Sequence, residues 1–203
     1  MMKLKMAWRQ SWQELGVAEP NMALCDTLLA AYAEPHRHYH TQQHLLECLE
    51  LLTSVRSHAE YPAEIEIALW FHDAIYAMGR QDNEARSADW AREAILAQGL
   101  AVDCAERVHA LIMATCHNTE PMNRDAQLMV DVDLGILGAE PARFSEYEQQ
   151  IRKEYAWVPG FVFKHKRREV LRGFLERARL YSDPALHAQR EKCARLNLQA
   201  ATT

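Results

Sequence analysis

Residues 62–79 read PAEIEIALWFHDAIYAMG, and this stretch decides the fold. Pro62 suits the first turn of a helix, where its missing N–H costs no hydrogen bond. From Ile65 to Met78 nearly every position is apolar, which is typical of a helix that is buried on most of its sides. We therefore expect a helix over 62–79 at the centre of the core.

Helical spacing recurs along the rest of the chain. Apolar residues follow one another at intervals near 3.6 residues, and further prolines stand where helices could open, while no stretch alternates with period two for long enough to predict a strand. The sequence therefore predicts an all-α protein of about eight or nine helices in a single compact domain, residues 1–203. We expect its core at about 22–157 and a basic helical arm at 161–200 packed on it. The residues that carry the helical spacing include Trp8, Trp12 and Leu15, Leu45, Leu49 and Leu52, and Phe144, Tyr147, Ile151 and Tyr155.

The composition is that of an ordinary globular protein. Hydrophobic residues make up 49% of the 203 residues and charged residues 25%, which argues against a disordered or low-complexity chain. No apolar run approaches the roughly 18 residues that span a bilayer, and the N-terminus lacks the apolar region of an export signal. The five cysteines are scattered without a C-x-x-C pair, as expected for reduced thiols. We therefore expect a cytoplasmic protein that does not contact membranes.

Charge is distributed unevenly along the chain. Residues 151–195 hold twelve Lys and Arg against five Asp and Glu, whereas the whole chain has a formal net charge of −5. We interpret this basic arm, including KHKRRE at 164–169, as a solvated helical surface; the alternative is that it attracts an anionic ligand. The acidic total argues against a nucleic-acid-binding protein.

Two polar residues interrupt the apolar helix expected at 62–79. His72 and Asp73 stand where a carboxylate is costly to bury unless it pairs with a cation or binds a metal. A buried salt bridge is the alternative explanation. Taken alone, the pair leaves both explanations open.

Further histidines precede the helix expected after Thr41. The segment HRHYHTQQH covers residues 36–44, and Thr41 is well suited to cap a helix that starts directly after it. His44 then lies in the first turn as a candidate metal ligand, while His40 lies one residue outside the helix and within reach of a bound group. We interpret His36 and His38 as loop surface.

A second carboxylate source is the segment LMVDVDLGILG at 128–138. Asp131 and Asp133 are two residues apart, or about 200° around a helix, so one of them is expected to face a shared centre. Two imidazoles and two carboxylates form a mixed nitrogen and oxygen set that suits Mn, Fe, Co, Ni or Mg, with zinc as an alternative.

These segments together resemble the HD superfamily of metal-dependent phosphohydrolases, in which a His, a His-Asp doublet and a distant Asp lie on helices. YHTQQH at 39–44, ALWFHD at 68–73 and MVDVDL at 129–134 are similar to motifs of its cyclic-nucleotide phosphodiesterase branch. DNEARSA at 82–88 and ARLNL at 194–198 are similar to segments of small bacterial phosphohydrolases of the superfamily. The resemblance implies an HD-type helical core over about 22–157. It also implies a divalent metal ion held by His44, His72, Asp73 and Asp133, and a leaving-group acid at His40.

The chemistry expected from this resemblance is hydrolysis of a phosphate ester by a water molecule that the metal activates. We expect a small phosphorylated substrate, with a nucleotide as the first choice; the alternative is a catalytically silent, metal-stabilised domain that senses a ligand. Glu84 is a candidate to orient the water, although a first-turn Glu also complements a helix dipole. His109 and His117 are candidates to hold a second ion or to touch phosphate, and each could equally be a core or surface histidine.

Overall fold

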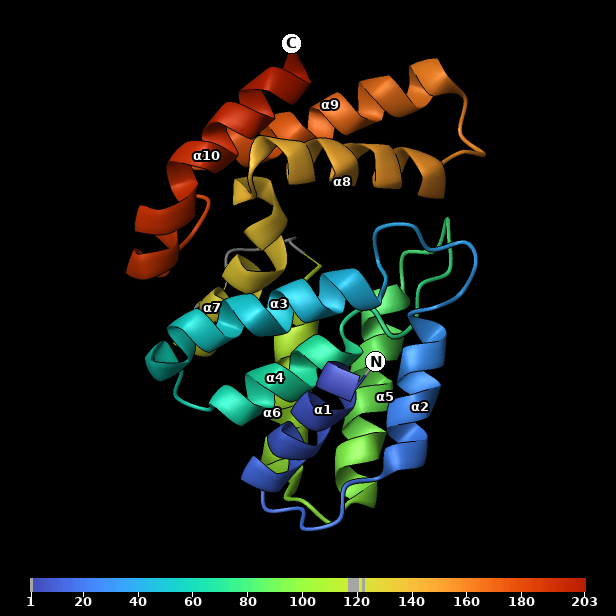
Figure 1. Ribbon diagram of the computed structural model, residues 1–203, viewed down its shortest axis with the longest axis vertical. Coiled ribbons are helices and arrows are strands. Elements are labelled where there is room, and N and C mark those ends of the chain that lie inside the picture. Colours follow the sequence, from blue (N-terminus) through green and yellow to red (C-terminus); the bar gives the residue numbers. More distant parts are fainter. Residues whose placement is uncertain (1, 117–120, 122) are drawn as a thin grey trace. The chain divides into compact units, whose positions relative to one another are not determined.

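The computed structural model describes residues 2–116, 121 and 123–203 (Figure 1). Within this part of the chain all regular structure is helical, with ten α-helices and two short 3₁₀ helices, so the prediction of an all-α fold is confirmed. None of these helices is long and apolar enough to cross a membrane. The elements are α1 (Met2–Glu14), α2 (Met22–Ala31), α3 (Gln42–Val55), η1 (Arg56–His58), α4 (Pro62–Phe71), α5 (Asn83–Ala97), α6 (Val102–Ala114), α7 (Arg124–Asp133), η2 (Leu134–Gly138), α8 (Pro141–Glu154), α9 (Gly160–Glu176) and α10 (Pro184–Thr202).

The chain forms two compact units, Met1–Val130 and Asp131–Thr203. The boundary falls inside α7. The expected single domain, with a core over about 22–157 and a basic arm over 161–200 packed on it, stays a prediction. Each unit has its own buried side chains and is described here by itself.

The first unit is built around α4. Eight of the ten residues of α4 are buried, as the apolar run predicted, and α1, α3, α5 and α6 pack against it (Figure 1). Trp8 of α1 makes edge-to-face contacts with Trp12 and with Trp70 of α4, with ring centroids 5.3 and 5.1 Å apart. All three indoles are at most 1% exposed, so this aromatic cluster supplies much of the buried apolar area of the unit.

The α4 helix ends at Phe71, eight residues earlier than the stretch 62–79 suggested. His72 keeps helical dihedral angles as the C-cap, and the N–H of Ala74 turns back to the carbonyl of Phe71 (2.8 Å). Further along, the side-chain amide of Asn83 accepts from the N–H of Ala77 and donates to its carbonyl, at 3.0 and 3.1 Å. Since the side chain of Asn83, the first residue of the next helix, satisfies both backbone groups of Ala77, that residue does not need helical hydrogen bonds.

The second unit consists of the end of α7 followed by η2, α8, α9 and α10, and α10 packs on η2 and α9. Gly138 makes this contact possible, because a Cβ there would lie 2.6 Å from Cβ of Arg190. The amide of Asn197 donates to the carbonyls of Leu137 (2.9 Å) and Ala139 (2.8 Å). In contrast, α9 has Leu171 as its buried residue, so most of the basic segment faces solvent, as expected.

Candidate metal centre

The structure places His44 in the first turn of α3. The side chain of Thr41 accepts a hydrogen bond from the N–H of Gln43 (3.3 Å), which starts the helix where the capping residue predicted. His44 is the third residue of the helix and is 2% exposed. Sγ of Cys48, one turn later, lies 3.6 Å from its Nδ1.

His72 and Asp73 lie at the C-terminal end of α4. Nδ1 of His72 donates to the carbonyl of Leu69 (2.8 Å). Since a carbonyl can only accept, the neutral ring carries its proton on Nδ1 and directs the lone pair of Nε2 away from the helix. This is the arrangement in which protein histidines bind metals, with the second nitrogen fixed by a backbone carbonyl.

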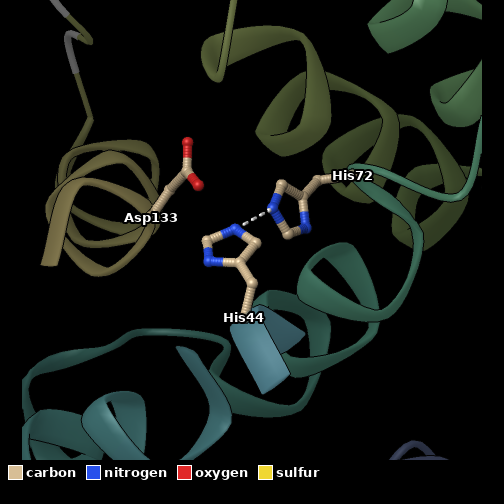
Figure 2. Close-up of side chains that lie close together, drawn as sticks. All are labelled: His44, His72 and Asp133. Atoms are coloured by element: carbon tan, nitrogen blue, oxygen red, sulfur yellow. Dashed lines mark hydrogen bonds between the residues drawn. The ribbon is translucent and has the colours of Figure 1, made fainter. Parts of the chain in front are cut away.

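Three ligand-type atoms of the first unit meet at this point. Nε2 of His44 lies 3.2 Å from Nε2 of His72 (Figure 2), and Oδ2 of Asp73 lies 3.1 Å from Nε2 of His72 and 3.5 Å from Nε2 of His44. A triangle with these sides has a point about 1.9 Å from all three corners. Protein nitrogen and oxygen ligands bind divalent transition ions at about 2.0–2.2 Å, so an ion slightly outside the plane of the triangle would reach all three atoms. Two imidazoles and one carboxylate on one face of an ion form a well-known set for metals with open positions.

The electrostatics of Asp73 also fit a cation. Its Oδ2 atom is buried and accepts no hydrogen bond within the described residues. Burial raises the pKa of the Asp73 carboxyl, but the adjacent imidazoles of His72, His40 and His44 outweigh burial and hold the pKa well below its usual range. Asp73 is therefore a half-buried carboxylate with one buried, unsatisfied oxygen, and such an oxygen is costly unless a cation neutralises it.

Asp133 is the last residue of α7, whose first residues belong to the unit that contains both histidines. The start of this helix is anchored by Asp125, whose carboxylate accepts the N–H groups of Glu60 and Tyr61, each at 2.8 Å. His44 and His72 belong to the first unit and Asp133 to the second, and each side chain offers an atom of a type that binds metal ions (Figure 2). The described residues thus contain a group that could hold a metal ion.

Asp131 has a different role. Its two carboxylate oxygens accept the N–H groups of Ser182 (2.9 Å) and Asp183 (2.6 Å), and Asp183 in turn caps α10. Burial raises the pKa of Asp131 to about 6, against the lowering effect of these two backbone hydrogen bonds. Its oxygens are therefore used to hold the segment before α10.

His40 lies beside the histidine pair. Its ring stacks on Tyr76, with centroids 4.3 Å apart, and meets Tyr39 edge to face at 4.9 Å. The centroid of His40 is 6.0 Å from that of His44. The imidazole is thus held next to the candidate ligands by two aromatic rings.

The other residues singled out from the sequence lie elsewhere. Glu84 is in the first turn of α5, and its charge acts on the thiol of Cys116, whose pKa is raised first by burial and then by Glu84. His109 lies 3.4 Å from the carboxylate of Asp89. Neither belongs to the group that could hold an ion, so a catalytic role for Glu84 stays a prediction, and His117 lies outside the described residues.

Sequence analysis missed Arg37, which the structure places under the site. The residue is 4% exposed, and its guanidinium donates to the carbonyls of Asp73 (2.5 Å), Ala74 (2.9 Å) and His40 (3.3 Å). Nε donates to the carboxylate of Glu34 (2.9 Å). One side chain thus ties the backbone of a candidate ligand to the backbone of His40. In the sequence Arg37 stands between two histidines that we interpreted as loop surface, and nothing there indicates that Arg37 is buried.

Comparison of the chain with protein-family models, with curated proteins and with solved structures found no match. What the site can do is therefore argued from its own atoms.

Proposed function

We propose that this protein is a divalent-metal-dependent phosphohydrolase of the HD type that acts on a small phosphorylated molecule. One observation supports this more than any other: ring nitrogens of His44 and His72 and an unsatisfied carboxylate oxygen of Asp73 surround a common point at bonding distance for a metal. Asp133 is proposed as the fourth ligand, as the resemblance to the HD superfamily implies.

The donor set narrows the choice of metal. Two imidazole nitrogens favour Mn, Fe, Co, Ni or Zn over Mg, which prefers oxygen ligands and retains several waters. When bound, such an ion acidifies water and withdraws electron density from a phosphoryl group. Structural zinc sites usually use thiolates, and no cysteine belongs to the ligand group found in the described residues.

The surrounding side chains would provide the rest of the reaction. His40 is proposed to donate a proton to the leaving oxygen of the ester, because an imidazole titrates near neutral pH and the ring is held beside the ligands. Arg37 would position the site by fixing the backbone of Asp73 relative to His40. A nucleotide is the proposed substrate class.

The test combines metal content with turnover. Purified wild type should hold about one transition ion per chain, and Asp73→Ala should lose it, since removing one of the four proposed ligands leaves a weak site. Asp89→Ala, an exposed carboxylate on α5 with 69% of its side chain accessible, is the matched control and should keep the ion. Metal analysis by mass spectrometry distinguishes these outcomes.

Turnover is measured on mono-, di-, tri- and cyclic nucleotides with Mn, Co, Ni, Fe, Zn and Mg. His40→Ala should retain the ion and lose about 10²- to 10⁴-fold in rate, the usual contribution of a general acid. A folded wild type that binds no ion would refute the proposal. Bound ion without turnover on any member of the panel would instead indicate a metal-stabilised sensing domain.

A further inference from the structure

The second unit contains a cavity of about 300 Å³ beside the first turns of α9. It has no residue in common with the candidate metal centre, and its argument does not depend on the proposed hydrolase activity. Its lining is dominated by cationic side chains. The residues that matter are Glu148, Arg152, Phe163, Lys164, Arg167 and Arg168.

One of the four cations is neutralised within the unit. Arg167 makes a two-pronged ion pair with Glu148, with Nη2 and Nε at 2.5 and 3.1 Å from Oε1, and its guanidinium lies 5.0 Å from the ring centroid of Tyr147. Glu148 is the acidic side chain among the lining residues. The charge of Glu148 therefore already neutralises Arg167.

Two of the other three cations, Arg152 and Lys164, face no carboxylate. Arg152 donates to the carbonyls of Tyr155 (2.6 Å) and Val158 (3.2 Å), whereas Arg168 donates to an oxygen of Thr203 (2.8 Å), the last residue of the sequence. The side chain of Lys164 has neither a hydrogen bond nor an ion pair within residues 123–203 as described, and it is exposed. Because like charges around one cavity repel each other, an anion bound there would lower the electrostatic energy of the unit.

The guanidinium of Arg152 is held in an orientation that suits a phosphate. Arg152 is held in place by its two carbonyl partners and by the ring of Phe163, whose centroid lies 4.9 Å from its guanidinium carbon. A planar guanidinium fixed in this way matches the oxygens of a phosphoryl group. Gly160, at the start of the 17-residue helix α9, also lines the cavity, so the positive end of the helix dipole adds to the field of the side chains.

From this arrangement we propose that the cavity is a binding site for the diphosphate group of a small molecule. A single phosphoryl group carries about −1.5 to −2 charges near pH 7, so a diphosphate, with more negative charge, gains more than one phosphoryl group from the uncompensated charges of Arg152 and Lys164. The volume lies at the small end of ligand pockets, which suits a diphosphate without a large attached body inside the cavity. The ligand class follows from the charge of the lining side chains and from the volume of the cavity. The class includes both free diphosphate and the diphosphate group of a nucleotide.

Isothermal titration of the full chain, depleted of metal on a chelating resin, tests this site. Pyrophosphate and ADP are the two probes, and orthophosphate is the comparison. We expect at least one diphosphate probe to bind more tightly than orthophosphate, with an affinity that falls as salt is added. Pyrophosphate binding alone identifies a free diphosphate, and binding of both probes extends the site to nucleotides.

Lys164→Ala is the decisive variant, because Lys164 makes no contact whose loss would disturb the fold. It should weaken diphosphate binding about tenfold, the effect of losing one charge-assisted hydrogen bond. Lys166→Ala is the matched control, since Lys166 pairs with Glu169 (2.8 Å) on the same helix outside the cavity, and it should leave the affinity unchanged. No binding of either diphosphate, equal affinity in Lys164→Ala, or binding of single-stranded RNA without binding of either diphosphate would overturn the proposal.

Discussion

Arg37→Lys tests whether a buried guanidinium holds the candidate metal centre together. The guanidinium lies between two aromatic rings, with its central carbon 5.3 Å from the centroid of Tyr32 and 5.4 Å from that of Tyr76. It donates to three carbonyls and one carboxylate from this enclosed position. Lysine keeps the charge but offers one nitrogen in place of three, so it cannot serve acceptors spread across a planar fork.

The size of the effect follows from the acceptors that lose their donor. A lysine nitrogen could reach one or two of the four acceptors, leaving at least two without a partner. Each buried carbonyl left unsatisfied costs about 1–3 kcal/mol, so we expect the free energy of unfolding to fall by about 2–6 kcal/mol. Because a typical domain is stable by about 5–15 kcal/mol, a loss in the lower half of this range leaves the variant folded.

The measurements are urea unfolding followed by circular dichroism and metal affinity from chelator competition. Arg37→Lys should weaken metal binding as well as stability, since the carbonyl of Asp73 loses its donor. Arg80→Lys is the matched control: Arg80 makes two hydrogen bonds to Asp82, each 2.6 Å, but 54% of its side chain is exposed. Its effect should stay within about 0.5 kcal/mol. If Arg37→Lys were as mild as Arg80→Lys in both assays, the positioning role would be refuted.

Two further predictions concern stability. Burial raises the pKa of Glu191, but Arg195 and two backbone N–H groups outweigh it and lower the pKa below 4.5. The resulting stability is present above that pH and is lost as pH falls through the folded-state pKa. Glu191→Gln should therefore destabilise the fold by about 1–2 kcal/mol at pH 7, and urea unfolding should show this loss shrinking as pH falls through the folded-state pKa; a loss that stays constant at every pH down to acid unfolding would contradict this. Trp8→Ala removes a fully buried indole and should cost about 3–5 kcal/mol, whereas Met6→Ala, 65% exposed on the same helix, should cost under about 0.5 kcal/mol; similar losses for both would disprove the assigned core.

Local signals in the sequence predicted most of the helices. Pro62, Pro141 and Pro184 each open a helix at its first turn, because the preference of proline for that position depends on backbone geometry alone. The apolar run that begins at Ile65 predicted the buried helix α4 correctly and its end wrongly. The side chain of Asn83, in the next helix, and that of Arg37, distant in sequence, supply hydrogen bonds to the segment after Phe71, and no local pattern contains the contribution of Arg37.

Some features of the candidate site could likewise be predicted from the sequence, and others depend on tertiary packing. His44 and His72 could be selected from the sequence, because a histidine at a capped helix start and a polar pair in an apolar run are unusual in themselves. That their ring nitrogens lie 3.2 Å apart follows from the packing of α3 against α4. Asp131 and Asp133 look alike in the sequence, and only the N–H groups of Ser182 and Asp183 show that the oxygens of Asp131 are already used.

The sequence by itself determined that this chain is helical, which helix is most buried, and which residue types could bind a metal, since these depend on composition and on spacing along one helix. Only the tertiary structure decided that Asp73 has an unsatisfied buried oxygen, that Arg37 supports its backbone, and that four cations of the second unit share a cavity. The physical reason is that burial and charge balance are set by neighbours in space, and those neighbours come from parts of the chain that local patterns cannot connect.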